Sequence, residues 1–190
     1  MPQANVHVRD AREVDLDALL EWWGSVHAEG VHVGPVAPAR PDQQFRQRLT
    51  DLMGNPKHRV LLAESSSELV GVAVVTLDVL SPVSDVETAQ VSFLHVSDRS
   101  RQRGAGRALL AAVADVAAER GADYVTVTAP PHARDATRFF ARLGFSPLVV
   151  RRVARTSVLQ SRLSGQSPSG RRDALRRRVT GRRQLQRAVS

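Results

Sequence analysis

The sequence predicts a mixed α/β fold in which helices cover a β-sheet. Stretches rich in β-branched residues and leucine mark six candidate strands, and apolar residues that recur every three or four positions mark helices between them. Their order along the chain is β-α-α-β-β-β-α-β-α-β. Because strands and helices alternate rather than falling into separate halves, we expect one sheet with helices packed on it.

The first part of the chain supplies one short strand and two helices. Residues 6–8 alternate with polar neighbours and predict the strand, and Pro41 marks the start of the second helix, which Gly54-Asn55-Pro56 ends. The first helix has an apolar stripe made of Val14, Leu16, Leu19, Leu20, Trp23 and Val26.

The remaining elements include a hairpin. Two β-rich runs, residues 59–64 and 69–80, flank the polar segment Ser65-Ser66-Ser67-Glu68, which predicts a turn between paired strands. The elements expected after it are a strand at residues 88–96, a long helix ended by Arg120-Gly121, a strand at residues 124–128, a helix at residues 135–143 closed by Gly144, and a last strand at residues 145–153.

Charge is divided unevenly along the 190 residues. The formal net charge is +8, but residues 151–190 hold 12 arginines and one acid, Asp173, which leaves 15 basic and 18 acidic residues in the first 150. The first part therefore carries about −3 and the last part about +11. Since the length leaves little room for a second full domain, we expect one domain, residues 1–153, followed by an arginine-rich C-terminal extension, residues 154–190.

Several classes of protein are excluded by composition. The chain has no cysteine, which excludes disulfides and thiolate metal sites, and its six histidines lack the spacing of metal ligands, so we expect no metal. No stretch approaches the roughly 20 apolar residues that span a bilayer, and the N-terminus lacks the apolar segment of a secretion signal. We therefore expect a cytoplasmic protein without a membrane partner.

The segment Arg101-Gln102-Arg103-Gly104-Ala105-Gly106 joins an apolar strand to a helix. Glycine lets the backbone approach a ligand closely, and the free N–H groups of a first helical turn lie at the positive end of the helix. Such a turn binds a diphosphate, and Arg107 adds to the positive charge around it. The alternative interpretation is a turn that needs glycine only for its geometry. A dinucleotide-binding turn has a third glycine and a P-loop ends in G-K-[ST], and both features are absent.

Two motifs resemble the GNAT superfamily of N-acetyltransferases. Arg101-x-x-Gly104-x-Gly106 fits the R/Q-x-x-G-x-G/A signature with which these enzymes bind the pyrophosphate of acetyl-CoA, and residues 136–145 are similar to a later motif, A-x-x-F-Y followed by x-x-x-G-F. The resemblance spans residues 5 to about 150. It implies a GNAT-like, largely antiparallel sheet that splays between its fourth and fifth strands, with about four flanking helices and the basic tail outside it.

The resemblance also implies where acetyl-CoA, the expected co-substrate, binds. Its pantetheine arm would lie against exposed backbone of the fourth strand, where an N–H would polarise the thioester carbonyl. The expected binding residues are Leu94, His95 and Val96 of that strand, then Arg101, Gln102, Arg103, Gly104, Ala105, Gly106 and Arg107 of the turn, and Phe140 of the later motif.

Two positions depart from the family pattern. The tyrosine that often acts as general acid is Phe140 here, and an asparagine often found three residues before the motif alanine is Ala133. These losses do not exclude catalysis, because a thiol with a pKa of roughly 8.5 can leave as a thiolate without simultaneous proton delivery. Phe140 is equally interpreted as a core residue whose ring packs against the cofactor arm.

The candidates for the general base are His95 and Glu87 near the fourth strand, with His132 beside the later motif. His95 has the appropriate pKa range, and its alternative interpretation is an ordinary side chain whose backbone alone matters. Trp22 and Trp23 lie in the region that lines the acceptor pocket in this family. Neighbours on a helix point about 100° apart, so we expect one to be core and the other to be available to an acceptor.

The C-terminal part has two interpretations. Residues 156–163 are expected to form a short helix and residues 164–170 a linker. Residues 165–190 either attach electrostatically to nucleic acid or another polyanion, without any base-reading motif, or form a solvated extension. The expected last strand lacks a hairpin partner, so a second copy of the chain or the tail is expected to cover its edge.

We expect an N-acetyltransferase that moves an acetyl group from acetyl-CoA to a small-molecule or protein amine by direct attack, without a covalent enzyme intermediate. The acceptor is not identified by the sequence. The competing hypothesis is a catalytically weak GNAT-like acyl-CoA-binding protein whose basic tail binds nucleic acid or a protein partner. Phe140, Ala133 and the tail favour this second hypothesis.

Overall fold

The computed structural model describes residues 6–28, 42–101, 103–129 and 133–164. The chain divides into two compact units, Met1–Phe139 and Phe140–Ser190. The first unit contains the described strands and the second contains the end of α4 and all of α5 (Thr156–Leu163). The expected domain boundary between residues 153 and 154 stays a prediction.

A five-stranded sheet in the order β1-β2-β3-β4-β5 forms the centre of the first unit. The strands are β1 (Val6–Asp10), β2 (His58–Ser65), β3 (Glu68–Val79), β4 (Glu87–Val96) and β5 (Tyr124–Val127). Strands β1 to β4 are antiparallel neighbours, whereas β5 pairs with β4 in parallel. A parallel neighbour requires a crossover connection, which α3 (Ala105–Glu119) provides. The predicted mixed, largely antiparallel α/β fold is confirmed.

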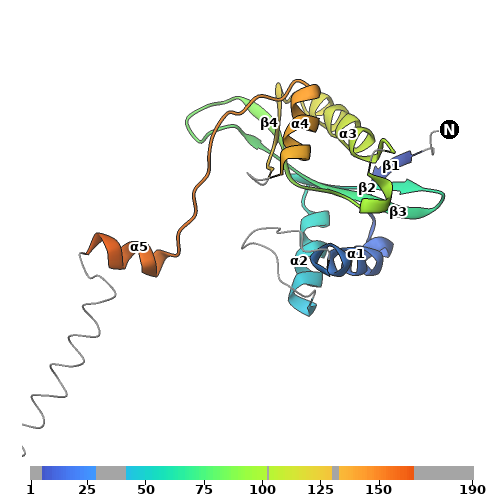
Figure 1. Ribbon diagram of the computed structural model, residues 1–190, viewed down its shortest axis with the longest axis horizontal. Helices are drawn as coiled ribbons and strands as arrows, with labels where there is room; N and C mark the ends of the chain where they lie inside the picture. The colour runs from blue at the N-terminus through green and yellow to red at the C-terminus, as the bar shows by residue number, and fades with distance from the viewer. Residues whose placement is uncertain (1–5, 29–41, 102, 130–132, 165–190) are drawn as a thin grey trace, which may run out of the picture. The chain divides into compact units, whose positions relative to one another are not determined.

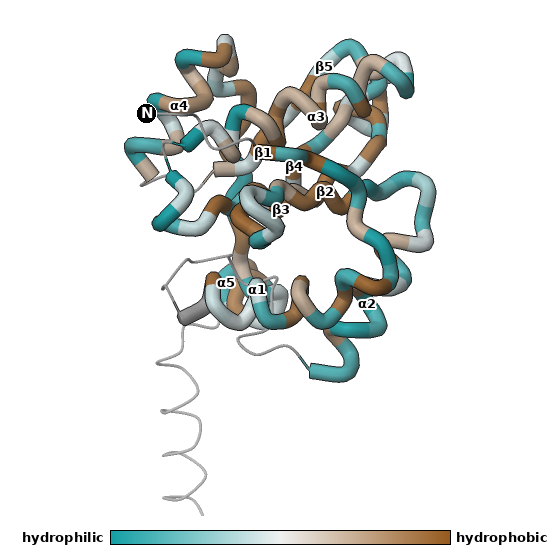
Figure 2. The backbone as a smooth tube through the Cα atoms, turned by 90° about the vertical axis from the view of Figure 1, so that its right-hand side faces the viewer, coloured by the Kyte–Doolittle hydropathy of each residue, from teal (hydrophilic) through white to brown (hydrophobic). Residues whose placement is uncertain are grey.

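Helices cover both faces of this sheet (Figure 1). On one face lie α1 (Leu16–Ala28) and α2 (Gln43–Gly54), and on the other lies α3. Hydrophobic residues are concentrated on the strands and alternate with hydrophilic ones along the helices (Figure 2). The core beneath α1 and α2 includes Leu19, Trp23, Phe45, Leu49 and Val72. Val14 is not in it and is 82% exposed, because it falls in the 3-10 turn η1 (Glu13–Asp15) before the helix begins.

An ion-pair network holds the start of α1 against the sheet. Arg9 on β1 donates hydrogen bonds to Asp15 in η1, at 2.7 and 2.8 Å, and to Glu64 on β2, at 2.6 Å. The bond from the guanidinium is the main reason why the pKa of Asp15 is lowered to about 2. A carboxyl whose pKa is lowered on folding stabilises the protein above its ordinary pKa, and this contribution is lost as the pH falls toward 2.

The predicted hairpin between β2 and β3 is confirmed, with Ser66 and Ser67 as its two central residues. Both have left-handed backbone conformations, with φ of 52° and 65°. Two-residue hairpins of this kind favour Asn-Gly, because a side chain at positive φ crowds its own backbone. The turn is therefore strained.

Replacing Ser67 by glycine should raise the free energy of unfolding by about 1 kcal/mol. The substitution relieves about 1–3 kcal/mol of left-handed strain and costs about 0.5–1 kcal/mol in chain entropy. Urea unfolding measures the difference. Ser25→Gly, within α1, is the matched control and should destabilise the protein. A Ser67→Gly variant no more stable than the parent protein would contradict the strain argument.

The predicted strand at residues 145–153 is wrong. In the second unit, residues 145–155 form neither helix nor strand. Leu148, Val149, Val150 and Val153 are 67%, 74%, 78% and 81% exposed. Their composition is typical of a strand, but a strand also needs a neighbour that pairs its N–H and C=O groups, and composition cannot provide one. The short helix expected after this run is present as α5.

Candidate functional site

The turn between β4 and α3 is the first part of the candidate site. The short η3 (Asp98–Ser100) follows β4, and α3 begins at Ala105 with Gly104 as its N-cap residue. Gly104 has a φ of 91°, a conformation that favours glycine, and it offers no side chain to cap the helix. The N–H groups of the first turn of α3 are therefore available to a ligand.

The arginines around this turn lie at the surface. Arg103 and Arg107 are exposed, whereas Arg101 is ion-paired with Asp98 at 2.8 Å. Gln102 lies outside the described residues. Two arginines thus remain beside the free N–H groups to attract an anion, because the pairing of Arg101 already offsets part of its charge.

The open half of β4 is the second part of the site. β5 pairs with β4 only from Thr88↔Tyr124 to Val91↔Val127, and the Thr128 N–H donates to the Val91 carbonyl at 3.2 Å. Beyond Val91, the described chain gives β4 no neighbouring strand on this side. The expected splay between the fourth and fifth strands is therefore present.

Backbone alternation shows which groups face the open side. The Ser97 N–H donates to the Val70 carbonyl on β3 at 3.0 Å. Hydrogen-bonded and non-hydrogen-bonded pairs alternate along an antiparallel ladder, so the backbone of His95 also faces β3. The N–H and C=O groups of Leu94 and Val96 then point to the open side. Of the three residues expected to offer backbone there, two do so and His95 does not.

A β-bulge at Ser92 determines the faces of the β4 side chains. Val75 lies opposite Val91 and Val74 lies opposite Phe93, so Ser92 is the extra residue between them. Directly opposite residues share a face of the sheet. Val74 belongs to the core beneath α1 and α2, and the Phe93 side chain lies on this face with it.

His95 is buried among aromatic rings on the same face as Phe93, two residues away, and is only 6% exposed. Its ring centroid lies 5.7 Å from that of Trp22, edge to face at 67°, and 6.3 Å from that of Phe93. Trp23 stacks on Phe93 at 4.4 Å and is part of the core. Trp23 is therefore core, as expected for one of the two tryptophans, whereas Trp22 is partly buried against the same core and contacts the candidate base.

Glu87 lies at the opposite end of β4. Its carbonyl accepts a hydrogen bond from the Asp123 N–H at 3.2 Å, beside the start of β5. Eight residues separate it from His95, which is about 26 Å along a strand. The two candidate bases are therefore not brought together, and of the two only His95 lies on the open half of β4. His132 lies outside the described residues.

Gly106 lies where the turn, β4 and α4 (Arg134–Arg142) meet. A Cβ atom at this position would lie 3.4 Å from Cζ of Phe139 and 3.8 Å from Cγ2 of Val96. The first turn of α3 thus packs closely against the end of β4 and against α4. These three elements border one region of the first unit, with free N–H groups on one side and open strand backbone on another.

Phe140 has a local packing role at the end of α4. Gly144, at φ 91°, donates to the Ala141 carbonyl, and Phe145 donates to the Phe140 carbonyl, both at 3.1 Å. This is the Schellman pattern, and its usual apolar contact is present because the rings of Phe140 and Phe145 lie 5.6 Å apart, edge to face. The Gly-Phe pair of the later motif is therefore a helix stop. Whether Phe140 also contacts acetyl-CoA stays a prediction.

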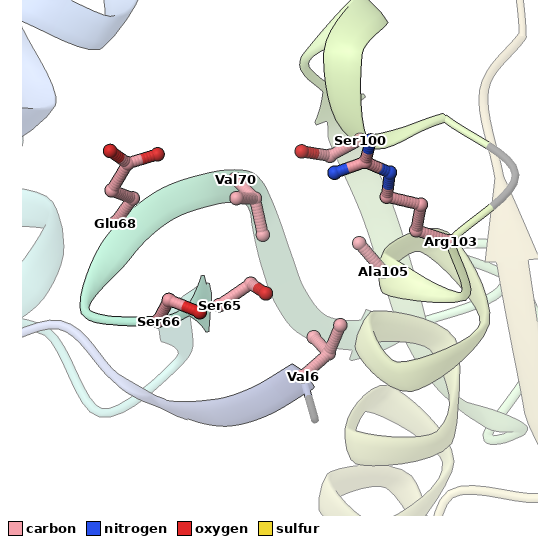
Figure 3. Close-up of a pocket in the computed structure, with 8 residues that line it drawn as sticks. All are labelled: Val6, Ser65, Ser66, Glu68, Val70, Ser100, Arg103 and Ala105. Atoms are coloured by element: carbon pink, nitrogen blue, oxygen red, sulfur yellow. The ribbon is translucent and has the colours of Figure 1, made fainter. Parts of the chain in front are cut away.

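A small pocket of about 160 Å³ lies beside the turn (Figure 3). Ser100, Arg103 and Ala105 form one side of it, and the β2–β3 hairpin forms much of the other. Its full lining is Val6, Ser65, Ser66, Glu68, Val70, Ser100, Arg103 and Ala105. Pockets for drug-sized ligands measure about 300–1,000 Å³, so this hollow is too small for a whole coenzyme.

Two other features of the described chain bear on the expectations. No group of three or more histidine, aspartate or glutamate side chains is arranged to hold a metal ion among the described residues. None of the described helices combines the length and the apolar character that crossing a membrane requires.

Solved structures share this architecture. A transcriptional regulator from Bacillus halodurans C-125 matches with a TM-score of 0.67 and 20% identity over 80% of this chain and 99% of the other. The aminoglycoside acetyltransferase meta-AAC0020, from an uncultured soil metagenomic sample, matches with a TM-score of 0.63 and 20% identity over 79% of this chain and 95% of the other. A ribosomal-protein-alanine N-acetyltransferase from Brucella melitensis biovar Abortus 2308 matches with a TM-score of 0.62 and 20% identity over 80% of this chain and 99% of the other. At these identities the matches show the fold.

Sequence comparison identifies the family. No curated protein gives a significant match. The acetyltransferase (GNAT) family matches residues 16–145, which include α1, the open strand β4, the glycine turn and the helix stop after α4. This match covers more than half of the chain and agrees with the splayed sheet, so the chain belongs to the GNAT acetyltransferase family.

Proposed function

We propose that this protein transfers an acetyl group from acetyl-CoA to a primary amine by direct attack. One observation carries the proposal. At a single end of β4, the first turn of α3 has no side-chain cap, and the backbone of Leu94 and Val96 is paired with no strand of the described chain on its open side. A diphosphate and a thioester on one extended molecule need these two kinds of partner.

The diphosphate of acetyl-CoA would bind the N–H groups of the first α3 turn, with Arg103 and Arg107 adding charge. The pantetheine arm would run along the open side of β4. The N–H of Leu94 or Val96 would then donate to the thioester carbonyl oxygen, which becomes negatively charged during attack. The strand that carries these N–H groups is held in place by its ladder to β3. The N–H groups therefore need no rearrangement to donate to the carbonyl oxygen.

Direct attack needs a neutral amine. We propose that His95 accepts a proton from the acceptor amine, whose nitrogen forms a bond to the carbonyl carbon while the carbon–sulfur bond breaks. The sulfur leaves as a thiolate with that electron pair. Phe140 has no proton to give, so the thiolate takes its proton from water, which a thiol pKa of roughly 8.5 permits, and His95 returns the proton that it accepted to the solvent. Cysteine is absent, so no enzyme thiol is available to carry the acetyl group.

Replacing His95 by glutamine should lower kcat for acetyl transfer by about 10²–10⁴, the usual contribution of one positioned acid or base. The affinity for acetyl-CoA should stay within about twofold, because the β4 backbone groups proposed to contact it belong to Leu94 and Val96. Steady-state thiol release measures the first quantity and calorimetry the second.

His58→Gln is the matched control, since His58 lies on β2 and contacts Thr76 at 3.1 Å instead. Equal turnover in His95→Gln and the unaltered protein would contradict the role of His95.

A catalytically weak binder of acyl-CoA is the second candidate, favoured by Phe140 and Ala133. The Ala133 carbonyl accepts from the Thr137 N–H at 2.9 Å, which places Ala133 at the N-cap of α4, where an asparagine side chain would cap the helix and alanine cannot. A panel of amines, polyamines, aminoglycosides and protein N-termini decides between the two. Acetyl-CoA binding without thiol release for any of them would favour the binder.

Two further partners belong to the proposal. Residues 165–190 hold eight arginines and one acid, which supports attachment to nucleic acid. A homodimer is supported by the exposed apolar run Leu148, Val149, Val150 and Val153 in the second unit, since such patches usually mark contact surfaces. Sedimentation analysis of the whole chain tests the dimer. The cytoplasmic location stays a prediction.

A further inference from the structure

We infer that the acceptor carries a hydrogen-bond-accepting oxygen on the carbon next to its amine-bearing carbon, and that the indole N–H of Trp22 binds this oxygen. The inference rests on the proposed acetyl transfer. It identifies the acceptor class as α-amino amides, peptide N-termini included, in preference to simple alkylamines.

The indole nitrogen of Trp22 is the first observation. The backbone carbonyl of Trp22 accepts a hydrogen bond from Ser25 Oγ at 2.8 Å, but its Nε1 is buried and has no partner among the described residues. Buried polar side-chain atoms are in large majority hydrogen-bonded, and an exception calls for an explanation such as an unseen water or ligand. We infer that its partner is a group of the bound acceptor.

The position of Trp22 beside the proposed base is the second observation. The two rings are in edge-to-face contact, with centroids 5.7 Å apart, so the residue with the unpartnered donor is a direct neighbour of the proposed base. Each hydrogen bond spans about 2.9 Å. In the inferred arrangement the amine contacts His95 and the oxygen on the adjacent carbon contacts Trp22. An acceptor held at two points has its nitrogen fixed in position for attack.

The surroundings favour one neutral amine over a polycation. The ring of His95 lies against the rings of Trp22 and Phe93, so the proposed base has an aromatic environment. Burial among rings disfavours the charged form of an amine and so favours the form that attacks. A carbonyl oxygen is neutral, so it can accept a hydrogen bond from the indole N–H without placing a charge among these rings.

Two acceptors matched in shape test the inference. Alaninamide has the oxygen, and in sec-butylamine an ethyl group replaces the carboxamide. Their values of kcat/KM are compared at equal concentrations of neutral amine, because the two amines have different pKa values. The unaltered protein should favour alaninamide by about five- to tenfold, which is the size of one neutral hydrogen bond.

Trp22→Phe keeps a ring against His95 and removes the N–H. It should lower kcat/KM for alaninamide by about five- to tenfold more than it lowers kcat/KM for sec-butylamine. Trp23→Phe is the matched control, since Trp23 stacks on Phe93 in the core. It should lower stability and leave the ratio of the two acceptors unchanged.

The possible outcomes distinguish failure of this inference from failure of the proposed acetyl transfer on which it rests. Transfer to both amines with equal kcat/KM in the unaltered protein overturns the inference alone and would leave an ordered water as the partner of Trp22. The same ratio in Trp22→Phe and the parent protein also overturns it. Failure to acetylate any amine, with acetyl-CoA still bound, overturns the proposed function and the inference together.

Discussion

Replacing Gly106 by valine should lower the affinity for acetyl-CoA by about 10- to 100-fold, whereas alanine at the same position should change it by less than about threefold. A Cβ atom here would already lie 3.4 Å from the Phe139 ring, an ordinary contact that alanine satisfies. The two additional methyl groups of valine have no such space. Forcing extra methyl groups into a packed region costs about 1–3 kcal/mol, and here it would part the first turn of α3 from β4 and α4.

Calorimetry on each purified variant measures this effect, with unfolding by urea as the check on folding. Gly54→Val is the matched control, because Gly54 ends α2 with no atom within 4 Å of its added Cβ. Undiminished affinity in a folded Gly106→Val protein would mean that the diphosphate of acetyl-CoA binds elsewhere.

Removing residues 165–190 should abolish the proposed nucleic-acid binding and leave acetyl-CoA binding within about twofold, since the glycine turn and β4 both precede the deletion. Each phosphate that an arginine neutralises releases a counterion, so binding through about 6–10 phosphates weakens by about 10³–10⁵ between 50 and 200 mM salt. Fluorescence anisotropy with a labelled RNA or DNA at both salt concentrations measures this slope for the intact chain.

Replacing only some of the tail arginines tests how the affinity for nucleic acid depends on their charge. Replacing Arg176, Arg177 and Arg178 by glutamine should lower the slope of log affinity against log salt by up to about 2.7, since each lost phosphate contact removes about 0.9. No binding by the intact protein at 50 mM salt would refute the nucleic-acid proposal. Loss of acetyl-CoA affinity on deletion would show that the tail is needed by the domain.

Local signals predicted most of the fold. Apolar periodicity located the four major helices within a few residues, and Gly121 and Gly144 were correctly taken as helix ends because each lies at positive φ immediately after the last turn. Such signals depend on a few neighbouring residues. The run at residues 145–153 shows the limit, since its strand-like composition depends on a pairing partner that sequence alone does not reveal.

The side of the sheet on which His95 lies could not be predicted from the sequence. Simple alternation along β4 puts Val91, Phe93 and His95 on one face. The bulge at Ser92 reverses that order, so that Val91 faces away from the core beneath α1 and α2 while His95 faces toward it. The contact between His95 and Trp22 follows from this one extra residue. No glycine or proline marks the bulge in the sequence around Ser92.

The short ladder between β4 and β5 means that the two neighbours of β4, β3 and β5, are held with different strength. β3 is bonded along most of its length on both sides, so its amides should exchange with solvent only when the whole sheet opens. β5 is attached to the described sheet by four paired residues, and local opening there costs far less free energy. A ligand that enters beside β4 can therefore displace β5 while the strand that holds Leu94, His95 and Val96 keeps its shape.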